Sequence, residues 1–101
     1  MLPGLALLPL PAVAAEWTLM GVGACRTLAG TNVTPISALR NVSWNACRQM
    51  CEQNEGCFGV EFNLRNDRSI CELHGTQVKA GPSGANDRVL TCWGKDVPVV
   101  E

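Results

Sequence analysis

The residues that carry most of the chemistry in this 101-residue chain are its six cysteines, three of which lie within CRQMCEQNEGC, residues 47–57. Clustered cysteines can bind a metal, exchange electrons or form disulfides. A structural zinc site takes four Cys or His ligands, usually as two close pairs such as C-x2-C. Here Cys47-x3-Cys51-x5-Cys57 is the one compact group, and the chain has a single histidine. The spacing therefore disfavours a metal site, and no metal or other cofactor is predicted.

Redox catalysis is also disfavoured by the cysteine spacing. A catalytic dithiol is typically C-x-x-C at a helix N-terminus, where the helix dipole lowers the thiol pKa. The sequence contains no C-x-x-C pair, and Cys51 falls near the C-terminal end of a predicted helix. The even number of cysteines instead favours disulfides, which stabilise domains whose small hydrophobic core is marginal on its own.

Six cysteines allow fifteen pairings, and the sequence alone does not choose among them. Helical geometry nevertheless makes one nested set reachable. Two cysteines one helical turn apart point to the same side, so one can reach the turn after the helix and the other the hairpin that follows. The pairs in this set are Cys51 with Cys57, Cys47 with Cys71, and the remaining Cys25 with Cys92.

The elements that must position these cysteines follow from local patterns. Ser43 is a good N-cap for a helix over residues 44–53, and residues at spacings of three and four share one face of it. That face holds Trp44, Cys47, Met50 and Cys51. Asn54 and Gly56 then predict an exit through a left-handed residue.

Strands are predicted on both sides of this helix. Phe58, Val60 and Phe62 alternate with Gly59 and Glu61, as in a half-buried strand. Residues 64–69 form a polar turn, so that 57–63 and 70–74 make a hairpin. A first strand over 16–23, with Trp17 and Leu19 on one face, and a last strand over 88–94 are also expected. Residues 26–43 and 75–87 are predicted to be irregular, the former with one short extended piece.

The N-terminal segment MLPGLALLPLPAVAA, residues 1–15, is uncharged and ends in small residues with A-x-A cleavage patterns. It predicts a secretory signal peptide, and so a secreted protein in an oxidising compartment. It is too short to span a bilayer as a helix, which takes ~20 residues. Because it lacks Lys and Arg and contains three prolines, an apolar tail or a truncated gene model remain alternatives.

The rest of the chain predicts one domain, residues 16–94, followed by a C-terminal tail or linker, residues 95–101. Its formal net charge is −1, with both signs interspersed and no run of five like charges. Such a balance disfavours a strong electrostatic interaction with DNA, heparin or anionic lipid.

The order of cysteines and neighbouring residues resembles the PAN/apple domain family. The matching features are Cys25, Cys47-x3-Cys51-x5-Cys57, the strand FGVEFN, Cys71 in C-E-L, and a late Cys92. The resemblance implies the same nested disulfides and an α+β fold with an antiparallel sheet of about five strands packed on one helix. It also implies a non-catalytic extracellular module that binds carbohydrate or protein. Alternatives are a small secreted enzyme inhibitor, with residues 75–87 as its reactive loop, or one module of a larger adhesin or zymogen-like protein.

Candidate ligand-binding residues lie on the polar side and tip of the predicted hairpin. Arginine suits bidentate recognition of carboxylates, although an ordinary solvated turn is the simpler interpretation. Trp93, at the end of the last strand, is a candidate platform for stacking a sugar, with a core position as the alternative. The hairpin residues in question are Glu61, Asn63, Arg65, Asp67 and Arg68.

Other polar residues give weaker signals for function. His74 lacks a recognisable nucleophile and is predicted to be exposed at a strand end, so no catalytic residues are assigned. Glu61 and Glu72 can face each other across the hairpin, but a solvated face beside Arg65 or Arg68 is favoured.

Asn32 and Asn41 begin N-x-[ST] sequons and are possible N-glycosylation sites. Pro35 after the first sequon lowers its expected occupancy, and Ser43 of the second is also the predicted N-cap.

Overall fold

The fold is described by a computed structural model for residues 15–65, 68–82 and 90–97, except the side chain of residue 65. A five-stranded antiparallel sheet has the order β1-β7-β4-β5-β3, and β2 and β6 form a separate two-stranded sheet. The elements are β1 (Trp17–Val22), β2 (Cys25–Thr27), β3 (Ser37–Arg40), α1 (Trp44–Glu52), β4 (Gly59–Arg65), β5 (Arg68–His74), β6 (Val78–Ala80) and β7 (Leu90–Lys95).

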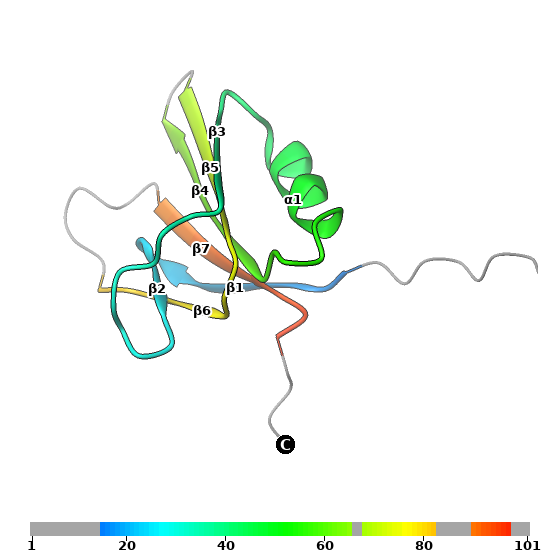
Figure 1. Cartoon of the computed structure of the whole chain (residues 1–101). Coiled ribbons are helices and arrows are strands. Elements are labelled where there is room, and N and C mark those ends of the chain that lie inside the picture. The colour runs from blue at the N-terminus through cyan, green and yellow to red at the C-terminus, as the bar shows by residue number, and fades with distance from the viewer. Residues whose placement is uncertain (1–14, 66–67, 83–89, 98–101) are drawn as a thin grey trace, which may run out of the picture.

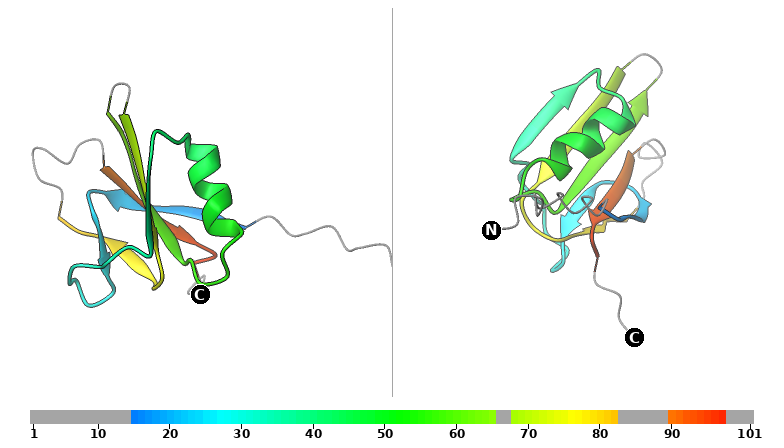
Figure 2. Two further views of the ribbon diagram at one scale, coloured as in Figure 1. Left: turned by 45° about the horizontal axis from the view of Figure 1, so that its top comes forward. Right: turned by 90° about the vertical axis from the view of Figure 1, so that its right-hand side faces the viewer.

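Helix α1 and the two-stranded β2–β6 sheet lie on opposite faces of the large sheet (Figure 1). The right-hand view of Figure 2 looks onto α1, which lies in front of β4 and β5. The β2–β6 sheet contacts β7 and β1 from the other side. The predicted α+β class, with about five antiparallel strands on one helix, is confirmed.

Helix α1 begins where its N-cap predicts. Ser43 has extended backbone angles, and its Oγ accepts a hydrogen bond from the N–H of Ala46 at 3.0 Å, which satisfies one of the free donors of the first turn. The predicted left-handed exit is wrong. Gln53 ends the helix in a right-handed conformation, and the Asn54 carboxamide turns the chain by accepting from the N–H of Gly56 at 2.9 Å. Met50 is 40% exposed, at the edge of the face predicted to be buried.

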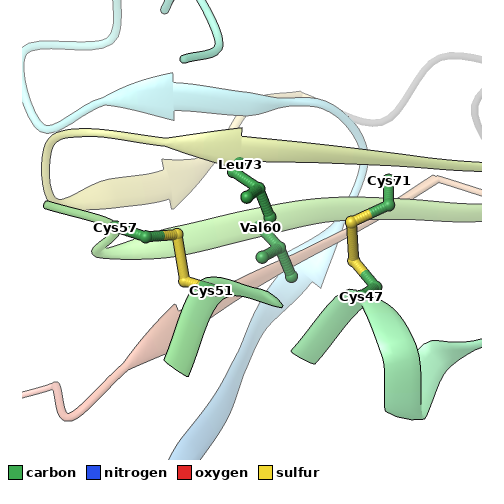
Figure 3. Close-up of a cluster of buried hydrophobic side chains, with 6 residues drawn as sticks. All are labelled: Cys47, Cys51, Cys57, Val60, Cys71 and Leu73. Carbon is green, nitrogen blue, oxygen red and sulfur yellow. A yellow bond between two sulfur atoms is a disulfide. The ribbon is translucent and has the colours of Figure 1, made fainter. Parts of the chain in front are cut away.

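The main core lies between α1 and the sheet and is rich in cystine (Figure 3). The sulfur atoms of α1 flank Val60 of β4 and Leu73 of β5, while Trp44 closes the cluster with Phe62 at a ring-centroid distance of 5.6 Å. Phe58, predicted to share this buried face, precedes β4 and is 42% exposed.

Three disulfides cross-link the fold. The outer bridge, Cys25–Cys92, ties β2 to β7; the middle bridge, Cys47–Cys71, ties α1 to β5; the inner bridge, Cys51–Cys57, closes the turn after the helix. All six cysteines are at most 2% exposed. These are the pairings that the family resemblance implies.

Several strands differ from their predicted extent. Strands β4 and β5 continue to a register pair of residues 65 and 68, so the predicted turn over 64–69 is mostly strand. Strands β2 and β6 lie in segments predicted to be mainly irregular, and β3 is the expected short extended piece. In β1 the register shifts between Leu19 and Gly21, and Met20 packs on the second core cluster. Trp17 and Leu19 pair with Lys95 and Trp93 before this shift, so they share one face as predicted, although Leu19 is 48% exposed.

No helix in the described ranges has the length and apolar character needed to cross a bilayer. The predicted signal peptide lies almost wholly outside the described residues, as do residues 98–101 of the predicted tail.

Candidate recognition site

A hollow on the described surface lies at the edge of the large sheet, where β3 ends and β5 continues toward the hairpin tip. Arg40 is the last residue of β3 and pairs with Ile70 of β5, so Arg68 and Ser69 extend beyond the β3 edge. The hollow measures about 270 Å³ and is named here the Arg40–Arg68 hollow. Its lining residues are Arg40, Asn41, Arg68, Ser69 and Ile70.

The backbone around this hollow is tied down by specific contacts. Asn41 has a φ of 60°, a left-handed conformation that asparagine tolerates better than most residues. Its N–H donates to the carbonyl oxygen of Ser69 at 2.8 Å. The Ser69 hydroxyl in turn donates to the carbonyl oxygen of Val42. These polar groups of Asn41 and Ser69 are therefore satisfied within the protein.

The electrostatics of the hollow favour an anion. Arg40 and Arg68 are both exposed, and no carboxylate of the described residues forms an ion pair with either one. Guanidinium groups are planar donors that bind carboxylate or sulfate groups through paired hydrogen bonds. Sequence reasoning identified Arg68 but missed Arg40, because the pairing of β3 with β5 has no local signal.

Two of the predicted hairpin residues do not lie on an open surface. Glu61 accepts a hydrogen bond from the N–H of Cys25 in β2 at 2.7 Å and is only partly exposed. Asn63 is 7% exposed, and its side-chain oxygen accepts from the N–H of Ile70 at 3.0 Å. The prediction of a solvated polar face is wrong here, because β4 is a central strand and β2 approaches the face opposite α1. Arg65 pairs with Arg68 in register, and Asp67 lies outside the described residues.

Trp93 lies in the core, not on an exposed stacking surface. Its ring centroid is 4.6 Å from that of Trp44, and it packs against the main cluster. Its indole Nε1 donates to the Thr91 hydroxyl at 2.9 Å, which satisfies the polar atom of a largely buried indole. The register of β7 on β4 places Trp93 opposite Val60, on the face that α1 covers.

His74, Glu61 and Glu72 form a cluster in which His74 is buried and the two glutamates are partly exposed. His74 is 1% exposed, so its predicted exposure is wrong, and burial lowers its pKa to about 4. Glu61 and Glu72 do face each other across the hairpin, but Glu61 is not on a solvated face. Burial raises the pKa of Glu61 above its ordinary value; the hydrogen bond from Cys25 opposes that shift and the Glu72 carboxylate reinforces it.

Both sequon asparagines are exposed, so their glycosylation stays a prediction. Ser43 of the second sequon is engaged as the N-cap of α1. Asn41 also lines the Arg40–Arg68 hollow, so a glycan there would occupy the same edge of the sheet.

Comparison with known proteins gives one match. Residues 25–92 match a family model described as the PAN domain. No curated protein and no solved structure matches the chain significantly.

Proposed function

This chain belongs to the PAN domain family, and we propose that it is a secreted, non-catalytic recognition module that binds anionic groups of a carbohydrate or a protein in the Arg40–Arg68 hollow. The family is one of protein- and carbohydrate-binding modules. The observation that carries the proposal is the pair of exposed arginines over a hollow of about 270 Å³.

The size and chemistry of the hollow support this choice. It can accept a sugar carboxylate, a sulfate or an acidic side chain, while a second hollow lined by Met20, Phe58 and Val97 among others measures only about 60 Å³. Three disulfides support an extracellular setting, because reducing compartments keep thiols reduced.

A non-catalytic role agrees with the state of the usual nucleophiles and bases. All six cysteines are in disulfides. Neither ring nitrogen of His74 has a hydrogen-bond partner among the described residues, so the one histidine is not paired with a hydroxyl nucleophile there. For the inhibitor alternative, part of the predicted reactive loop is strand β6, which leaves fewer residues for an extended binding loop.

The proposal is tested by measuring binding to three probes: uronic-acid and sulfated oligosaccharides, their neutral counterparts, and an acidic peptide. Arg40→Gln and Arg68→Gln should each weaken binding of the acidic probe about tenfold or more, since a charge-assisted hydrogen bond contributes about 1.5–3 kcal/mol. Arg48→Gln is the matched control, because Arg48 lies on α1 and pairs with Glu52 at 2.9 Å. Preference for the sugar or the peptide identifies the class of ligand.

Unchanged affinity in both Arg40→Gln and Arg68→Gln would remove the hollow as the binding site. Binding should also weaken as salt is added, because exposed charges are screened. Measurements before and after peptide-N-glycosidase treatment establish whether a glycan on Asn41 blocks the hollow.

A further inference from the structure

The imidazole of His74 is a buried polar group without a satisfied partner. It is the single histidine of the chain and is 1% exposed. Both Nδ1 and Nε2 lack a hydrogen-bond partner within the described part of the chain. Leaving a buried polar atom unpaired costs about 1–3 kcal/mol, and native proteins rarely leave such groups without a reason.

Two carboxylates lie next to this ring. Glu72 Oε1 is 3.9 Å from His74 Nε2, which is too long for a hydrogen bond. Glu61 is directly opposite Glu72 in the β4–β5 register, and its carboxylate oxygen lies within 4.8 Å of a ring nitrogen of His74. Cys25 Sγ shares this neighbourhood, but it is bonded to Cys92 and offers no thiolate.

We propose that His74, Glu61 and Glu72 form a binding site for a divalent metal ion of the zinc class. Imidazole and carboxylate ligands suit this class, whereas calcium and magnesium prefer oxygen ligands alone. Ligand atoms on a tetrahedral zinc ion are about 3.3 Å apart, given bonds of about 2.0–2.1 Å. The separation of 3.9 Å between Glu72 Oε1 and His74 Nε2 has to shrink by about 0.6 Å. The Glu61 oxygen, which lies within 4.8 Å of a ring nitrogen of His74, has to move closer by up to about 1.5 Å.

The surroundings of these three residues suit a bound ion. The N–H of Cys25 holds Glu61 Oε1 at 2.7 Å, and hydrogen bonds of this kind orient a metal-ligating carboxylate. The Glu72 side chain is 29% exposed, which gives an ion a path from solvent. The ion bridges β4 and β5 directly and reaches β2 through Cys25, so its role is structural, and it is independent of ligand binding at the Arg40–Arg68 hollow.

The experiment uses the oxidised chain without a polyhistidine tag, stripped with EDTA and titrated with Zn²⁺. Calorimetry should give one ion per chain, and thermal unfolding should shift upward with Zn²⁺, because an ion bound to the folded state stabilises it. The ring-proton NMR signals of His74 should move on binding; with one histidine in the sequence, their assignment is unambiguous.

Glu72→Gln removes one proposed ligand at a partly exposed position and should weaken Zn²⁺ binding at least tenfold. Glu55→Gln, an exposed carboxylate in the turn after α1, is the matched control and should bind like the parent chain. Unmoved His74 signals at 1 mM Zn²⁺, or equal affinity in the Glu72→Gln and Glu55→Gln variants, would overturn the proposal.

Discussion

The three disulfides close loops of very different length although their sulfurs are equally buried. The paired cysteines are 67 residues apart in the outer bridge, 24 in the middle bridge and 6 in the inner bridge. Each bridge stabilises the fold by restricting the unfolded chain, and this contribution grows with the logarithm of loop length. Allowing for nesting, which shortens the two larger loops, the contributions are about 4, 3 and 2 kcal/mol respectively.

Replacing both cysteines of one bridge by alanine tests this order. All six side chains are at most 2% exposed, so each double variant loses similar packing, and the differences between variants report mainly on loop length. The outer-bridge variant should lose about 2 kcal/mol more stability than the inner-bridge variant. The measurement is the free energy of unfolding in urea, followed by the fluorescence of the partly buried Trp44–Trp93 pair.

Peptide mapping without reduction must first show that the two remaining bridges in each variant are native. Equal losses in the outer and inner variants, or a larger loss in the inner one, would refute the loop-length argument. The bridges would then stabilise the fold mainly through contacts made in the native core.

Two further changes test the packing around the buried histidine. Gly59→Ala places a Cβ 2.7 Å from the carbonyl oxygen of Trp93, which cannot move aside, and should cost about 1–3 kcal/mol by thermal unfolding; the exposed Gly56→Ala is its control. In EDTA, the contribution of His74 to the free energy of unfolding should fall by about 3 kcal/mol between pH 7 and pH 4, because its pKa is near 6.5 in the unfolded chain and is lowered to about 4 in the folded state. His74→Gln should flatten this pH profile. Comparing the variant with the parent chain cancels the opposite contribution of Glu61, whose raised pKa favours the folded state on acidification. Parallel profiles of the two proteins would show that His74 is not the source of the pH dependence.

The elements that local patterns specify were predictable from the sequence. The N-cap at Ser43 and the spacing of three and four residues along the face that holds Cys47 and Cys51 locate α1. Alternation of apolar and polar residues locates β4 and β5. The cysteine order identifies the family, which the match over residues 25–92 confirms. In each of these cases the deciding interaction lies within a few positions along the chain, or in a motif whose spacing is unusual.

Strands β2 and β6 could not be predicted in the same way. Each has three residues, too few to show a period, and their partners Cys25 and Ala80 are far apart in sequence. Non-local pairing of such short strands depends on the outer bridge and on packing against β7, neither of which local sequence reveals.

The β2–β6 sheet, which the sequence did not predict, explains why the candidate site lies at the sheet edge and not on the polar side of β4. An alternating strand such as β4 normally has one solvated face, which would make Glu61 and Asn63 accessible. Once Cys25 of β2 approaches that face, the same carboxylate becomes part of a polar cluster with Glu72 and His74. The surface that we propose for recognition is the sheet edge beyond β3, where Arg68 pairs with β4 but not with β3. Polar residues in an alternating strand are therefore candidates for surface binding only after the second face of the sheet is known to be open.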